Sequence, residues 1–115
     1  MPNVVTRDKW YQLAKKLLEQ TRSGKILWDV DIYSGQVIAP IGSHNICLSS
    51  DEGTDDFFVR VEDRFEAVVD RFGTKDYEAH EFEERQKIKE LYVEARRSAT
   101  NADAAIDEIL DALGD

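Results

Sequence analysis

The hydrophobic residues of this chain change their spacing twice, and these changes limit the possible folds more than any other feature. Large apolar residues recur every three or four positions near the start, at every second position through the middle, and every three or four positions again near the end. A spacing near 3.6 residues predicts an amphipathic helix, whereas alternation predicts a strand with one buried face. The sequence therefore predicts a helix, then a group of strands, and then further helices.

The first helix is predicted from about Thr6 to Ser23. We expect Thr6 to cap the first turn, Asp8 to lie favourably within that turn, and Gly24 to end the helix in a left-handed conformation. The apolar stripe of this helix consists of Trp10, Leu13, Ala14, Leu17 and Leu18.

The alternating segments predict an antiparallel meander of four to five strands. The segment from Val61 to Phe72 is ambiguous, because its apolar residues also fit a helical stripe. We favour a hairpin through residues 63–66, since Val68, Val69 and the nearby aromatic residues suit a sheet. The predicted strands cover residues 26–33, 37–41, 46–49, 57–62 and 67–72.

Two helices are predicted after the strands. The first runs from about Asp76 to Ala99, and the second restarts at Thr100 or Asn101 and ends at Leu113. Their apolar positions recur with helical spacing, and Gly114 follows the second helix as a stop signal.

This order of elements indicates a single α+β domain over residues 1–115. Strands that are segregated from helices and joined by short connections predict an antiparallel sheet, with the two C-terminal helices packed on one face. We expect Trp28 to be buried beneath the helices together with Leu17, Leu91 and Leu110.

Charge is distributed unevenly along the chain, whose net charge is −9. From Arg7 to Lys25 there are six basic residues against two acidic ones, whereas from Asp76 to Asp115 there are twelve acidic residues against five basic ones. A pI near 4.7 argues against partners such as nucleic acid or an anionic membrane, which need a basic surface. The asymmetry predicts two complementary surfaces that neutralise each other within one chain or join two chains.

Four cationic residues are the candidate interaction residues. Lys15 and Lys16 lie in the first helix, and Arg96 and Arg97 follow the apolar stripe of the second. The arginine pair could clamp an anion or a partner carboxylate. The alternative, which we favour, is an ion pair between these arginines and the acidic third helix.

The sequence predicts no catalytic, cofactor-binding or metal-binding residues. Cys47 and His44 lie three positions apart on a strand and should point to opposite faces, so we interpret Cys47 as a small buried apolar residue. The loop from Asp51 to Asp56 holds four acidic residues without the spacing of a calcium loop, and whether it binds a cation stays open. A single cysteine and the lack of an apolar leader predict a cytoplasmic protein, and no apolar run is long enough for a membrane span.

Two segments carry a resemblance to known proteins. The N-terminal segment comprises residues 17–21, Gly24, Lys25 and Trp28. The C-terminal segment comprises residues 90–99 and the short acidic helix that follows. In layout, the chain resembles a group of small prokaryotic α+β domains of uncharacterised function, from bacteria or phages. The resemblance implies the same fold and a bacterial or phage context, and it brings no active site to transfer.

Three functions are compatible with these observations. The first is a non-catalytic protein-interaction or accessory domain, which self-associates or binds a protein partner. The second is an acidic inhibitor or immunity-type protein that blocks a basic target. The third, a small enzyme that uses Cys47, His44 or acidic residues, is disfavoured because no nucleophile, base and stabilising group are placed together.

Overall fold

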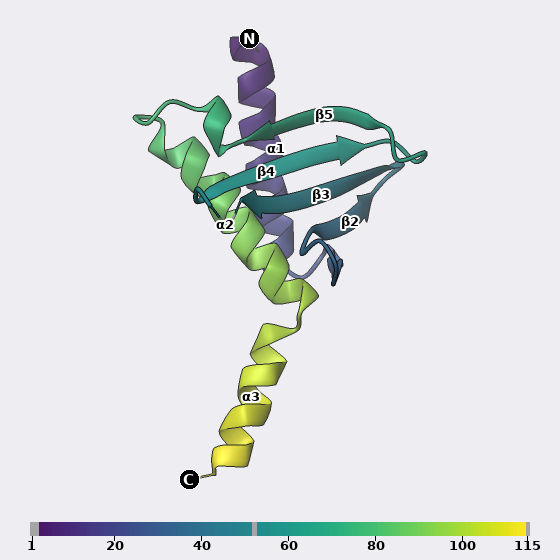
Figure 1. The fold of residues 1–115 in the computed structure, drawn as a ribbon, viewed down its shortest axis with the longest axis vertical. Coiled ribbons are helices and arrows are strands. Elements are labelled where there is room, and N and C mark those ends of the chain that lie inside the picture. The colour runs from purple at the N-terminus through teal and green to yellow at the C-terminus, as the bar shows by residue number, and fades with distance from the viewer. Residues whose placement is uncertain (1–2, 52, 115) are drawn as a thin grey trace.

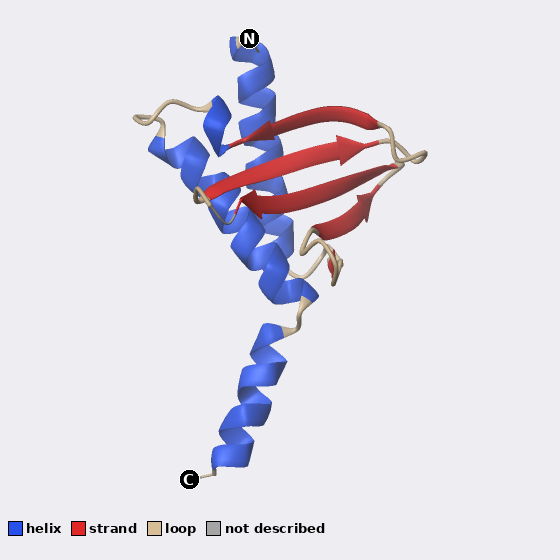
Figure 2. Ribbon diagram, viewed as in Figure 1, coloured by secondary structure: helices blue, strands red, loops and turns tan. Residues whose placement is uncertain are grey.

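The computed structural model describes residues 3–51 and 53–114 and shows an α+β fold with the predicted order of helix, strands and helices (Figures 1 and 2). One helix precedes the strands and the other helices follow them, as the two changes in hydrophobic spacing predict. The helices are α1 (Val4–Arg22), the short 3₁₀ helix η1 (Thr74–Asp76), α2 (Phe82–Ala99) and α3 (Ala102–Leu113). The strands are β1 (Asp29–Val30), β2 (Val37–Ile41), β3 (His44–Asp51), β4 (Asp56–Glu62) and β5 (Val68–Gly73).

The five strands form one antiparallel sheet in the order β1-β2-β3-β4-β5, so each strand lies beside its neighbour in sequence. Leu48 of β3 pairs with both Val37 of β2 and Val59 of β4, and Val59 pairs in turn with Phe72 of β5. These cross-strand neighbours share one face of the sheet, and all four are buried. The predicted hairpin between β4 and β5 is confirmed, and its turn is closed by hydrogen bonds to the carboxylate of Asp63.

Helix α1 begins earlier than expected. Its N-cap is Asn3, whose side chain accepts a hydrogen bond from the backbone N–H of Thr6 at 2.8 Å, so the prediction that Thr6 caps the helix is wrong. Asp8 consequently lies beyond the first turn. The predicted end is confirmed, because Gly24 adopts a φ of +75° and Lys25 donates from its backbone N–H to the carbonyl of Gln20.

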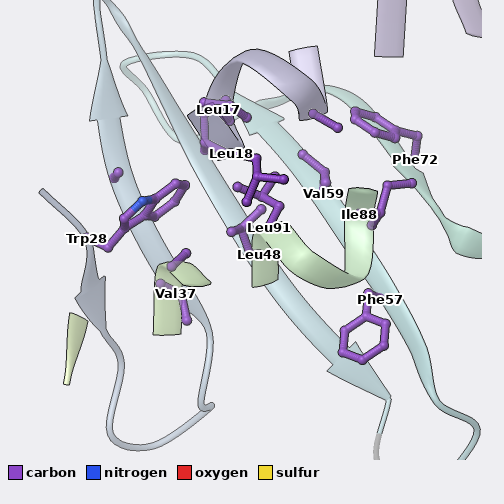
Figure 3. Close-up of a cluster of buried hydrophobic side chains, with 14 of the residues drawn as sticks. Leu17, Leu18, Trp28, Val37, Leu48, Phe57, Val59, Phe72, Ile88 and Leu91 are labelled. Carbon is purple, nitrogen blue, oxygen red and sulfur yellow. The ribbon is translucent and has the colours of Figure 1, made fainter. Parts of the chain in front are cut away.

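Helices α1 and α2 lie on the same face of the sheet and bury one hydrophobic core (Figures 1 and 3). Ala14, Leu17 and Leu18 of α1 meet Ile88 and Leu91 of α2 in this core. The strands contribute the inward-facing side chains Val37, Ala39, Ile46, Leu48, Phe57, Val59 and Phe72.

Trp28 lies at the β1 end of this core, as predicted. Its side chain is 5% exposed, and its indole N–H donates to the hydroxyl of Thr21 at 2.9 Å. The same hydroxyl donates to the carbonyl of Leu17 at 2.6 Å. Leu17 and Leu91 are buried with Trp28, but Leu110 is 58% exposed, so its predicted place in the core is wrong.

Strand β1 and helix α2 are both shorter than predicted. A turn over residues 31–35, in which the Asp31 carboxylate accepts from the backbone N–H of Tyr33, ends β1 and leaves Ile32 82% exposed. Asp76, the predicted start of α2, lies instead in η1, and its carboxylate accepts from the backbone N–H of Gly73. Within the described residues, every helix is too short or too polar to span a bilayer.

Candidate interaction surface

One face of α3 carries a row of exposed apolar side chains. Ile106, Ile109, Leu110 and Leu113 are 47%, 57%, 58% and 75% exposed, and α3 buries none of its residues. Because these positions follow helical spacing, they form one continuous stripe, which we call the α3 stripe. Large apolar side chains gathered in this way mark a surface that binds another apolar surface.

Helix α3 continues from the end of α2 and extends away from the sheet (Figure 1). Asn101 supplies the change of direction, because it adopts a left-handed φ of 54° directly before the first turn. Thr100 donates from its hydroxyl to the carbonyl of Arg96 at 2.9 Å, which closes the last turn of α2. The chain therefore changes direction between α2 and α3 within two residues.

The side of α3 away from the stripe is acidic. Helix residues turn by about 100° each, so Asp107, Glu108 and Asp111 lie on the side opposite the stripe, and Asp103 lies at its edge. No basic residue lies between Ala102 and Leu113. Helix α3 is therefore an amphipathic helix with a purely anionic polar face.

The candidate residues Lys15 and Lys16 lie on the exposed side of α1 but differ in their surroundings. Lys15 lies over the ring of Tyr11, with its Nζ atom 4.4 Å from the ring centroid, and it lines a groove between α1 and α2. Lys16 lies outside that groove, 3.9 Å from the carboxylate of Glu19 in a largely exposed pair.

The groove beside Lys15 follows the line where α1 packs against α2. Its volume is about 310 Å³, and it is lined by Lys15, Leu18, Glu19, Arg22 and Lys87. Arg22 and Lys87 both form ion pairs with the carboxylate of Glu90, at 3.2 and 3.8 Å, so the groove has no excess of positive charge. The methylene stems of its lysines and arginine lie beside Leu18. A second groove of about 330 Å³ adjoins it at Lys87 and is also lined by Glu83, Gln86 and Phe82, which is 76% exposed. We call the two together the α1–α2 groove.

Arg96 and Arg97 have different roles. Arg97 forms an ion pair with Asp103 at the start of α3, which confirms for this residue the predicted contact with the acidic third helix. Arg96 instead donates to the carbonyl of Gly35 and to the hydroxyl of Tyr92, at 3.4 Å each. Since these contacts are exposed, each adds little to stability.

The face of the sheet away from the helices carries Cys47. The side chain is 3% exposed and lies across from Ile38 and Arg60 in the sheet. Burial, followed by the nearby carboxylate of Glu62, raises the pKa of the Cys47 thiol. His44 is exposed at the start of β3, and the register places it on the other face, so the two side chains are not brought together.

The acidic loop before β4 ends in a buried residue. Asp56 is 8% exposed, and its carboxylate accepts from the Thr74 hydroxyl at 2.9 Å and lies 3.6 Å from Lys75. Hydrogen bonds from the hydroxyls of Thr54 and Thr74 hold the pKa of Asp56 below its usual value. Asp56 therefore joins β4 to η1, whereas Asp51 and Asp55 are exposed at the surface.

Comparison with known proteins finds no family model that matches the chain, and no curated protein or solved structure with significant similarity. Sequence reasoning identified the apolar residues of α3 but assigned them to the core. The sequence gives no signal that separates a helix packed on its own chain from an uncovered one, because the apolar spacing is the same in both cases.

Proposed function

We propose that this chain is a non-catalytic protein-interaction domain and that α3 is the element that contacts the partner. The observation that carries the proposal is the α3 stripe, four large apolar side chains on a helix with no buried residue. Folded chains rarely leave such a stripe uncovered, because apolar contact area is the main favourable term in both folding and association.

The length of α3 supports this proposal. A helix of 12 residues is marginal in water without packing, even when its residues favour helix formation. Full burial of one Leu or Ile side chain contributes about 1.5–3 kcal/mol, so covering the exposed part of the stripe adds about 4–7 kcal/mol, an upper estimate because the unfolded chain is not fully extended. That gain favours burial of the stripe against another surface and, with it, the helical state of α3.

The polar side of α3 restricts the class of partner. Four carboxylates without a basic residue favour a basic partner over an acidic one. The same anionic face supports a second candidate function, an acidic inhibitor that covers the basic surface of a target protein. In that case the captured partner is a basic enzyme or toxin rather than an assembly partner.

Site-specific photo-crosslinking in native cells tests the proposal. A photoreactive residue replaces Ile109 within the stripe, and in a matched control it replaces Ala104 on the opposite side of the same helix. We expect a discrete protein adduct at position 109 and much less adduct at position 104. Equal labelling at both positions, or no protein adduct at either, would contradict a binding role for α3.

A further inference from the structure

Strand β5 forms an edge of the sheet. In the part of the chain that the structure describes, β5 has a neighbouring strand on one side only, and β1 at the other end of the sheet is two residues long (Figure 1). An edge strand presents a row of backbone N–H and C=O groups to which an extended segment of another chain can pair. Val68 and Val69 of β5 are 57% and 58% exposed, and exposed β-branched residues favour such pairing.

The register of the sheet shows which N–H groups of β5 face away from β4. Phe57 donates from its backbone N–H to the hydroxyl of Thr74 at 3.2 Å, so this N–H points to the β5 side of β4. Residues two apart in a strand share a hydrogen-bonding side, so Val59 also faces β5, and its partner there faces β4. The residues on either side of that partner, Arg71 and Gly73, therefore direct their N–H groups outward.

Both of these outward N–H groups are occupied by carboxylates of the same chain. Arg71 donates to the Oδ1 atom of Asp70, and Gly73 donates to the Oδ2 atom of Asp76, at 2.8 Å each. The other carboxylate oxygen of Asp70 accepts from the indole N–H of Trp10 at 2.8 Å, which anchors this side chain to α1. An added strand would bring a carbonyl oxygen to each N–H, where it would have to displace a charge-assisted hydrogen bond and would meet negative charge.

Two irregular residues limit pairing at the edges further. The register between β4 and β5 skips Val69, which forms a bulge and interrupts the regular ladder. At the other end of the sheet, β1 pairs with only the first two residues of β2. The uncovered part of β2 contains Pro40, which has no N–H to offer to an added strand.

We propose that the carboxylates of Asp70 and Asp76 close the β5 edge against strand addition by a second copy of this chain. The second copy is the relevant competitor, because its own β5 carries the same exposed valines and two antiparallel β5 strands related by a two-fold axis would join two sheets into one. This device acts on the sheet, so the inference goes beyond the proposed function and does not depend on what α3 binds.

Removing both carboxylates from the edge tests the proposal. Asp70→Thr together with Asp76→Ala, which we call the opened variant, frees the two outward N–H groups. Sedimentation of the full chain should then show association at concentrations about tenfold or more below those of the unmodified protein, with an infrared signal of added intermolecular β-sheet. Glu66→Gln with Glu78→Gln is the charge-matched control, because it removes two exposed carboxylates that flank β5 in the chain, and it should leave association unchanged.

Two further variants separate an open edge from a weakened fold. Trp10→Phe removes the indole donor to Asp70 but leaves this carboxylate on the edge, and it keeps an aromatic ring to stack on Phe72. We expect Trp10→Phe to lower stability without causing association. Arg71→Pro, added to the opened variant, removes an outward N–H that β4 does not use, so it should restore the behaviour of the unmodified protein.

Circular dichroism and thermal unfolding check the fold of every variant. If the opened variant is unfolded, Asp70→Thr and Asp76→Ala are measured singly, and each should associate more than Glu66→Gln or Glu78→Gln alone. Three results would overturn the proposal: folded edge variants that associate no more than their charge controls, Trp10→Phe that associates as strongly as they do, or association that persists after Arg71→Pro is added.

Discussion

The hydrogen-bonded pair formed by Trp28 and Thr21 provides a quantitative test of how the core is held together. Trp28 is 5% exposed, and its indole N–H donates to the Thr21 hydroxyl, which donates in turn to the carbonyl of Leu17. Removing the indole by Trp28→Ala deletes a large buried side chain and should lower the free energy of unfolding by about 3–5 kcal/mol. This contribution comes mainly from lost packing rather than from the hydrogen bond.

Thr21→Val removes the hydrogen bonds of this hydroxyl while the side chain keeps its shape. The substitution leaves the buried indole N–H of Trp28 without its acceptor, and an unsatisfied buried donor costs about 1–3 kcal/mol. Trp28→Phe removes the donor instead, so in the double variant part of the Thr21→Val penalty disappears. We expect a coupling free energy of about 1 kcal/mol in the double-mutant cycle.

Urea unfolding followed by far-UV circular dichroism measures these differences. Thr100→Val is the matched control, because the Thr100 hydroxyl makes the same bond to the carbonyl four residues earlier, at 2.9 Å, but in an exposed position. Its effect should stay within about 0.5 kcal/mol. An effect of Thr21→Val no larger than that of Thr100→Val, or a Trp28→Ala cost below about 1 kcal/mol, would refute this account of the core.

Three further predictions concern the sheet. A Cβ atom at residue 73 would lie 2.5 Å from the carbonyl oxygen of Phe57, so Gly73→Ala should lower the free energy of unfolding in urea by about 1–3 kcal/mol. Gly53→Ala is the control and should be nearly neutral, because the atom nearest to its added Cβ lies 3.5 Å away. Because the folded pKa of Asp56 lies below its usual 3.8, its contribution to stability is complete above that value and is lost as pH falls through the folded pKa. Asp56→Asn should therefore lower the urea midpoint of unfolding at neutral pH, and the midpoint of the variant should decrease less than that of the unmodified protein as the pH falls. An unchanged pH dependence would contradict the stabilising role of the Asp56 carboxylate. Cys47, buried and with a raised pKa, should react with iodoacetamide much more slowly in the folded protein than in urea, and equal rates would show that the thiol is accessible.

The sequence was sufficient to predict the sheet and the packed helices, because their signals are local. Neighbouring strands in the chain also pair in the sheet, so alternating residues such as Val59 and Phe72 identify both the strand and its buried face. Strand β1 shows how a local turn overrides the alternation. Ile32 follows the pattern but is exposed, since Asp31 and Gly35 form a turn that ends the strand.

The interaction surface could be predicted only in part. The apolar spacing of α3 revealed a stripe, but periodicity does not say whether a stripe faces the same chain, another chain or solvent. The prediction that Leu110 lies in the core depends on this spacing alone, and it is wrong. The charge pattern likewise selected Lys15 and Lys16 together, and only the packing of α1 against α2 places Lys15 in the groove and Lys16 outside it.

Amide hydrogen exchange of α3 tests the central claim most directly, because it reports whether this helix is covered. In the dilute chain, where association is negligible, the amides of residues 103–113 should exchange with little protection, while those of β4 in the centre of the core should be strongly protected. Protection of α3 should then rise as the complex forms, and β4 should change little. Protection of α3 equal to that of β4 in the dilute monomer would show that the helix is packed on its own chain and would contradict its role as the binding element.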